Sequence, residues 1–225
     1  MLLRVLLYIF WIVLLSTVYL RFQSTEHQSP RTEQPADLVE PSSGSIPAHG
    51  ANVTEAHQLV PRTVHFVFGL APDFGKKPFG LVHYLAIKSA RQNIRPEQIF
   101  WYYKHLPSSS NHYWQKAKPF LTLVDLQQEQ FQEFDAFIAQ MKHVAHKADL
   151  YRLLILRKYG GIYLDTDMVI LQPFPQSWFE EPTVLAQEGR SAAHGLCNAF
   201  IMAQPQSFFV RVWLTHYRRF SNSAL

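Results

Sequence analysis

Two aspartates that are separated by one residue, Asp165 and Asp167, are the strongest candidates for chemistry in this sequence. They follow the apolar residues 162–164, which predict a short buried strand with the aspartates at its end. In an extended chain, side chains two residues apart project to the same side. Two neighbouring carboxylates repel each other unless a cation neutralises them, and oxygen ligands suit Mg²⁺ or Mn²⁺. The pair therefore predicts a site for a divalent metal and a substrate diphosphate.

The chemistry that such a site favours is the transfer of a sugar from a nucleotide-diphosphate sugar. When the sugar leaves, negative charge grows on the β-phosphate oxygens, and a bound metal is placed to stabilise that charge. Asp149 and Arg152 lie three residues apart on a predicted helix, so their side chains share one face. We expect Asp149 to hold sugar hydroxyls and Arg152 to hold phosphate. The alternative is a purely structural ion pair between these two residues.

A helix and a strand joined by two glycines must position the aspartates. Residues 148–159 are rich in leucine and predict the helix. Gly160 and Gly161 end it, because glycine tolerates the left-handed conformation that a helix C-terminus often needs. Residues 162–164 then form the strand that carries the aspartates.

The rest of the folded region alternates between strand and helix patterns. This alternation predicts a mostly parallel sheet, in which ligands bind beyond the carboxyl ends of the strands. The predicted strands are 60–68, 98–103 and 120–126, and the predicted helices between them are 81–92 and 113–118.

Four aromatic residues on the predicted strands, Phe66, Phe68, Trp101 and Tyr102, have two interpretations. Strand aromatics mostly belong to the core of a protein. They are also suited to stack on a nucleotide base, and Phe66 is the candidate that we name for this contact.

The N-terminal part of the chain predicts a membrane anchor and a stem. Residues 5–20 are uncharged and apolar, and Arg4 and Arg21 flank them, so residues 1–22 predict a short cytoplasmic tail and a signal anchor. A cleaved signal peptide is the alternative, but bulky residues stand where cleavage needs small ones. Residues 23–58 are polar and rich in proline, which predicts a disordered lumenal stem. Asn52 begins a glycosylation sequon in this stem.

Composition excludes several classes of protein. The formal net charge is +4, but the basic residues are scattered, so nucleic acid is not an expected partner. Cys197 is the single cysteine, which rules out an intrachain disulfide and a cysteine-rich zinc site. Residues 59–225 are long enough for one α/β domain.

The motifs together resemble the family 32 glycosyltransferases, the DXD-containing group that includes fungal Golgi mannosyltransferases and animal α-1,4 sugar transferases. The similarity is strong over residues 143–171, and VPRTVHFVFG and QEGRSAAHGLCNAFIMAQP extend it over most of residues 60–215. It implies a GT-A fold, that is, a Rossmann-type α/β domain for a UDP- or GDP-sugar. It also implies Mn²⁺ or Mg²⁺, a glycan or glycolipid acceptor, retention of configuration, and a type II Golgi membrane protein with a lumenal catalytic domain.

The resemblance assigns roles to individual residues. The second aspartate of the motif usually ligates the metal, and the first reaches the ribose, the donor sugar or a metal-bound water, so Asp165 and Asp167 are the expected catalytic and metal-binding residues. The expected substrate contacts are Asp149 and Arg152 of the Asp-x-x-Arg motif, Gly161 and Tyr163 of GG-x-Y, Asp165, and Asn198 before an apolar stretch.

Two alternative functions remain at this point. Residues 164–169 are similar to the nucleophile strand of haloacid-dehalogenase-like phosphotransferases, in which the first aspartate is phosphorylated. However, that group needs a downstream lysine, and no lysine follows Asp167. The other alternative is a truncated, inactive transferase-like protein that binds nucleotide sugar, because the family usually continues with acceptor-binding elements beyond the point where this sequence ends.

Overall fold

The computed structural model describes residues 58–129, 131–189 and 195–221. The chain divides into the units Met1–Thr54 and Glu55–Leu225, and all described residues belong to the second. The predicted anchor, almost all of the predicted stem and Asn52 lie outside the described residues. Among the residues that the structure describes, no helix is both long enough and apolar enough to cross a membrane.

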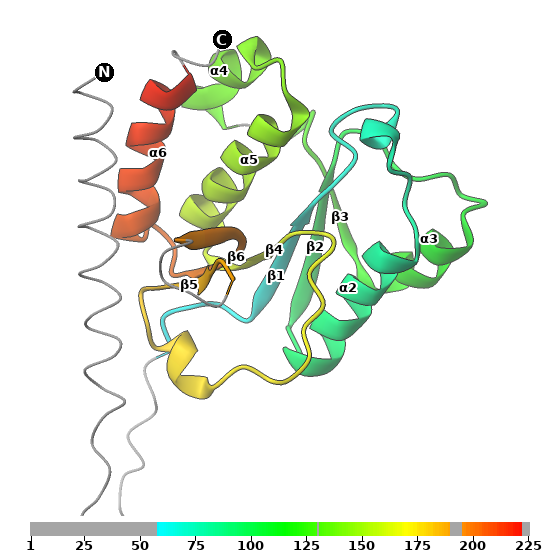
Figure 1. Ribbon diagram of the computed structural model, residues 1–225, viewed down its shortest axis with the longest axis horizontal. Helices are drawn as coiled ribbons and strands as arrows, with labels where there is room; N and C mark the ends of the chain where they lie inside the picture. Colours follow the sequence, from blue (N-terminus) through cyan, green and yellow to red (C-terminus); the bar gives the residue numbers. More distant parts are fainter. Residues whose placement is uncertain (1–57, 130, 190–194, 222–225) are drawn as a thin grey trace, which may run out of the picture. The chain divides into compact units, whose positions relative to one another are not determined.

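A six-stranded mixed sheet forms the centre of the described unit (Figure 1). The strand order is β3-β2-β1-β4-β6-β5; β1 to β4 are parallel, whereas β6 runs antiparallel to β4 and β5 runs antiparallel to β6. The predicted strands are therefore present, and two antiparallel strands extend the parallel part. The strands are β1 (Thr63–Val67), β2 (Gln98–Tyr103), β3 (Thr122–Asp125), β4 (Gly161–Leu164), β5 (Thr183–Gln187) and β6 (Leu196–Ala203).

Helices connect and cover these strands. The helix that precedes the aspartates, α5, begins four residues earlier than its leucine pattern predicts and ends at the predicted residue. The α-helices are α2 (Leu81–Asn93), α3 (His112–Ala117), α4 (Asp135–Gln140), α5 (Val144–Tyr159) and α6 (Phe208–Ser221). The short 3₁₀ helices are η1 (Phe74–Lys76), η2 (Lys118–Phe120), η3 (Gln132–Phe134) and η4 (Gln176–Phe179).

The sheet separates two hydrophobic cores, because alternate strand residues point to opposite faces. Phe66 and Trp101 lie in the core that α2 covers. Val67 and Tyr102, the next residues on the same two strands, lie in the core that α5 covers. Helices therefore pack on both faces of the sheet (Figure 1).

The chain changes direction at β1, and this defines where a ligand is expected. From β1 the chain moves through α2 to β2 and then β3 on one side, and afterwards returns through α5 to β4 on the other side. In open α/β sheets, ligands bind at such a reversal, beyond the carboxyl ends of the two diverging strands. Here those ends are the residues that follow Val67 and Leu164.

The two glycines end α5 as the sequence predicts. Gly160 has φ +65°, and its N–H donates to the Leu156 carbonyl over 2.9 Å. Gly161 has φ +94°, and a Cβ at this position would lie 2.7 Å from His65 Nε2 and 2.8 Å from the Thr63 carbonyl oxygen. Close packing against β1 and the backbone conformation therefore both require glycine at position 161.

We expect Gly161→Ala to lower the free energy of unfolding by about 3 kcal/mol or more, because it adds a steric clash to a positive φ. Gly75→Ala is the matched control: Gly75 has φ +62°, but no described atom lies within 4 Å of the place that its Cβ would occupy. The control should cost only about 1 kcal/mol. Chemical denaturation measures both values, and equal losses would contradict the packing argument.

His65 is a buried histidine that joins β1 to β2. Its Nδ1 lies 3.2 Å from the Tyr102 hydroxyl, and its Nε2 lies 3.2 Å from Thr63 Oγ1. The ring stacks on that of Phe100. Burial lowers the pKa of His65 to about 4, although a hydrogen bond to the Gly160 backbone opposes this shift. The ring is therefore neutral in the folded protein at neutral pH.

We expect acid to destabilise the protein through His65. Since its folded pKa is below the unfolded value of 6.5, the unfolded state binds the proton first, and stability falls as the pH drops from about 6.5 to about 4. The loss from this group should approach about 3 kcal/mol. Denaturation measured across this pH range gives the free energy of unfolding at each pH. The plot of this free energy against pH should be flatter for His65→Gln than for the wild type. His112→Gln, at an exposed histidine, should leave the pH dependence unchanged.

Candidate functional site

The two aspartates lie directly after β4, at the edge of the sheet where a ligand is expected. The Asp165 N–H donates to the Ala199 carbonyl of β6 over 2.8 Å, which extends the pairing of β4 with β6 by one residue. The Met168 N–H then donates to the Asp165 carbonyl over 3.0 Å, so the chain turns at Thr166 and Asp167. The expectation that the chain stays extended through both aspartates is therefore wrong, because it turns directly after Asp165. Asp165 is half-buried and Asp167 is exposed.

Arg152, which is 5% exposed on α5, is the centre of the site. Its Nη2 lies 3.0 Å from Asp149 Oδ1 and 3.2 Å from Asp165 Oδ1. Its Nη1 donates to the Asn198 carbonyl over 2.6 Å, and its guanidinium lies over the ring of Tyr163, 4.6 Å from the centroid. One buried cation therefore joins α5 to β4, β6 and the start of the aspartate turn.

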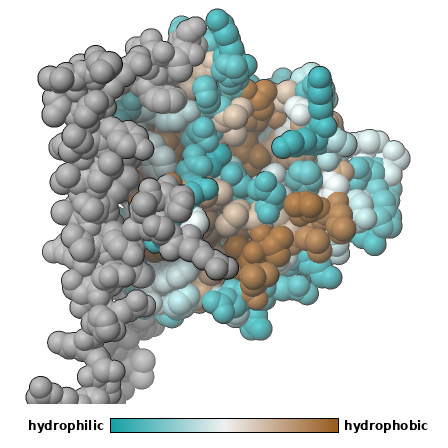
Figure 2. Space-filling model, viewed as in Figure 1, coloured by the Kyte–Doolittle hydropathy of each residue, from teal (hydrophilic) through white to brown (hydrophobic). Residues whose placement is uncertain are grey.

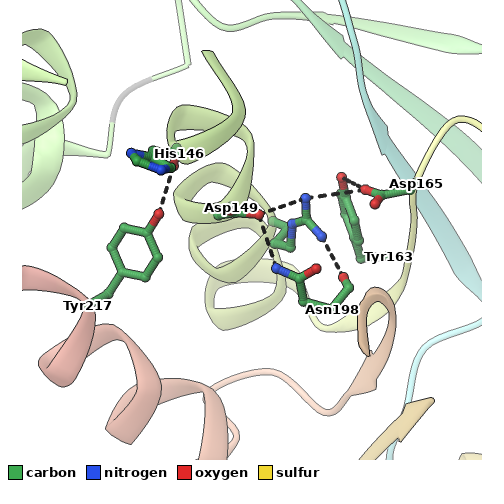
Figure 3. A network of polar contacts seen from close by, with 7 residues as sticks. His146, Asp149, Tyr163, Asp165, Asn198 and Tyr217 are labelled. Carbon is green, nitrogen blue, oxygen red and sulfur yellow. Dashed lines mark hydrogen bonds and ion pairs between the residues drawn. The ribbon is translucent and has the colours of Figure 1, made fainter. Parts of the chain in front are cut away.

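Two polar residues complete this network (Figure 3). The Tyr163 hydroxyl donates to Asp165 Oδ1 over 2.7 Å, and the Asn198 amide donates to Asp149 Oδ1 over 3.0 Å. Figure 3 shows these four labelled side chains converging from α5, β4 and β6. The sequence-predicted residues Asp149, Arg152, Tyr163, Asp165 and Asn198 therefore form one connected group.

The electrostatics of Asp165 reflect opposing effects. Burial raises the pKa of this carboxyl, whereas the Arg152 guanidinium and the Tyr163 hydrogen bond lower it, and the nearby Asp167 and Asp149 carboxylates raise it. Both close contacts are made to Oδ1, so Oδ2 has no hydrogen bond or ion pair with the described residues. The cation that compensates Asp165 inside the protein is Arg152.

Asp167 differs from Asp165, because within the described ranges its side chain forms no hydrogen bond or ion pair. An exposed carboxylate of this kind, two residues after an aspartate whose Oδ2 is also unbonded, offers the oxygen ligands that Mg²⁺ and Mn²⁺ prefer. The described residues contain no group of three or more histidine, cysteine, aspartate or glutamate side chains suited to a metal. Two carboxylates fit a metal that shares its remaining ligands with substrate phosphates and water.

Two residues that the sequence assigns to the substrate lie elsewhere. Phe66 is fully buried and packs on Trp101 with ring centroids 5.9 Å apart, so its ring belongs to the core and the predicted base contact is a wrong assignment. Gly161 is buried at the beginning of β4, at the opposite end of the strand from Asp165. Its role is the close packing against β1 described above.

The structure also shows a connection that no sequence motif signals. After the aspartate turn the chain lies against α2, where the Ile170 N–H donates to Ser89 Oγ over 3.0 Å. The Asn93 side chain donates to the Ile170 carbonyl over 2.6 Å. Serine and asparagine are ordinary residues on a helix, and their partner lies far away in the sequence. These two bonds hold the aspartate turn next to α2.

We expect Arg152→Met to lower the free energy of unfolding by about 3 kcal/mol, because it leaves two partly buried carboxylates without their cation. Arg157→Met is the matched control on the same helix, since Arg157 forms an ion pair with Glu133 that is more exposed. That change should cost less than about 1 kcal/mol. Urea denaturation of both variants tests the comparison, and similar losses would show that Arg152 is not a structural centre.

Sequence comparison relates this site to known proteins. Residues 84–185 match the family described as a glycosyltransferase sugar-binding region containing a DXD motif. The chain is 41% identical over 172 residues to glucan organizing enzyme 1 of Cryptococcus neoformans var. grubii serotype A, and the match covers 72% of this chain and 45% of that protein. It is 43% identical over 49 residues to human alpha-1,4-N-acetylglucosaminyltransferase, covering 22% of this chain and 13% of that protein. The chain thus spans less than half the length of these relatives, and both comparisons agree with the predicted resemblance to DXD-containing glycosyltransferases.

Solved structures with a similar arrangement include two transferases. PaToxG glycosyltransferase has a TM-score of 0.49 and 18% identity, and the match covers 71% of this chain and 62% of that one. Bacterial N-acetylglucosamine transferase NleB has a TM-score of 0.43 and 11% identity, covering 71% of this chain and 79% of that one.

Proposed function

We propose that this chain transfers a sugar from a nucleotide-diphosphate sugar to a glycan or glycolipid acceptor, because residues 84–185 match a glycosyltransferase sugar-binding region containing a DXD motif. The observation that carries this proposal is the asymmetry of the two aspartates. Arg152 and Tyr163 hold Asp165, whereas the exposed Asp167 has no partner in the described part of the chain. An unpaired carboxylate beside a fixed one is suited to a metal that arrives with the donor.

In this proposal, Asp167 and Oδ2 of Asp165 hold Mn²⁺ or Mg²⁺. The metal supplies positive charge where the departing diphosphate becomes more negative. Asp149 and Asn198 supply polar atoms for the hydroxyls of the sugar. Arg152 is too deeply buried to serve mainly as a phosphate ligand, so its task is to keep Asp149 and Asp165 in place. We extend the family's GT-A fold and retention of configuration to this chain as part of the same proposal.

The acceptor and the cellular location complete the proposal. The names of the two relatives refer to glucan and to N-acetylglucosamine, which supports a carbohydrate acceptor or donor. Figure 2 shows apolar side chains gathered over the region of α2, where Leu81, Val82 and Leu85 are exposed, and such a surface suits the lipid part of a glycolipid. The apolar residues 5–20 and the Asn52 sequon support a type II Golgi membrane protein with a lumenal domain.

We expect Asp167→Asn to weaken Mn²⁺-dependent binding of UDP or GDP by at least about tenfold, since it removes a charged metal ligand of similar shape. Isothermal titration of the full-length chain, purified in detergent, measures this affinity with Mn²⁺ and with a chelator. Glu181→Gln, which neutralises an exposed carboxylate elsewhere, is the control and should bind as the wild type does.

Two results would contradict the proposal. The first is equal binding by the wild type and Asp167→Asn, with or without Mn²⁺. The second is the formation of an acyl phosphate at Asp165, which would favour the phosphotransferase alternative.

A further inference from the structure

We propose that His83, on the first turn of α2, is a further donor-binding residue whose Nε2–H donates a hydrogen bond to a diphosphate oxygen of the nucleotide sugar. This inference rests on the proposed function, because it places the diphosphate next to Asp167. It adds α2 as a second wall of the site, opposite the network that α5, β4 and β6 build around Arg152.

Hydrogen bonds hold α2 and the chain that follows the aspartate turn together. The chain after Asp167 reaches α2 at Ile170, which is buried and bonded through its N–H to Ser89 and through its carbonyl to Asn93. These bonds fix the segment between Asp167 and Ile170 along the helix. The N-terminal part of α2 follows the carboxyl end of β1, and β1 pairs in parallel with β4 through His65 and Tyr163, so this part of the helix and the aspartate turn belong to the same edge of the sheet.

His83 lies at the same edge of the sheet as the aspartate turn, because its ring packs against that of Phe68, the residue that directly follows β1. Burial is the largest effect on the pKa of His83 and lowers it, but Asp167 raises it and Lys77 lowers it. No hydrogen bond joins His83 to Asp167 among residues 58–129 and 131–189.

The ring of His83 is held in one orientation and in one tautomer. The Gly80 N–H donates to Nδ1 over 2.9 Å, so the proton of the neutral ring is on Nε2. The ring stacks on Phe79 with centroids 5.2 Å apart, and the ring of Phe68 lies 4.8 Å away. Phe68 directly follows β1, so the carboxyl end of that strand helps to hold the imidazole. A donor that is fixed before binding loses little entropy when it meets a ligand.

A purely structural role explains only half of this arrangement. Accepting the hydrogen bond from Gly80 caps the start of α2, and a glutamine at the same position would do this equally well. The cap requires an acceptor at Nδ1 and makes no use of the donor at Nε2. In the described ranges that donor has no partner, and it belongs to a side chain that packs against Phe68 at the carboxyl end of β1.

The test compares His83→Ala with His83→Gln in the full-length protein. We expect His83→Ala to weaken Mn²⁺-dependent binding of UDP or GDP about tenfold, and to change binding of UMP or GMP less than about twofold, because only the diphosphates offer the second phosphate. His83→Gln should recover most of the lost affinity, since its amide supplies both a cap acceptor and a donor. Gln92→Ala, at an exposed residue near the other end of α2, should bind as the wild type does.

Each result decides the inference. Equal weakening for monophosphates and diphosphates, with a lower melting temperature of the ligand-free protein, would mean that His83 is structural and would overturn the proposal. Unchanged diphosphate binding by His83→Ala would also overturn it, and the proposed function would still stand if Asp167→Asn loses binding. If the wild type binds neither diphosphate with Mn²⁺, the proposed function and the role of His83 fail together.

Discussion

The charge of Arg152 is the constraint on which the site depends. A guanidinium that is 5% exposed would be very costly without partners, so the surrounding chain must deliver oxygen atoms to it. Asp149 comes from the same helix, Asp165 from the end of β4 and the Asn198 carbonyl from β6. Satisfying this one cation brings together three elements that are far apart in the sequence. It also separates the roles of the two aspartates, because Asp165 is bound inside the protein and Asp167 is not.

The topology explains why this network lies where a donor can reach it. The reversal of the chain between β1 and β4 leaves the carboxyl ends of these strands without a covering connection. The network occupies the α5 side of this edge, and α2 reaches the same edge from the other face of the sheet. The bonds from Ser89 and Asn93 to Ile170 connect the two sides, so the aspartate turn lies between two fixed walls.

Local patterns predicted the elements more reliably than they predicted where side chains point. The leucine-rich helix, the glycine pair and the short strand before Asp165 are all present. The assignment of Phe66 failed because strand residues alternate between faces, and the face of Phe66 is covered by α2. The expectation of an extended chain through the two aspartates failed because the chain turns after Asp165. A turn and a covered face both depend on contacts that sequence spacing does not contain.

By itself, the sequence determined the strands β1 to β4 and the helices α2, α3 and α5, the position of the aspartates at a strand end, and the set Asp149, Arg152, Tyr163, Asp165 and Asn198. These features follow from short-range periodicity, from the conformational freedom of Gly160 and from recognisable motif spacing. Tertiary structure alone decided the burial of Arg152, the exposure of Asp167, and the packing of His83 against Phe68 at the same edge of the sheet. The physical reason is that burial and electrostatic proximity arise when distant segments pack against each other, and no local pattern specifies which segments these will be.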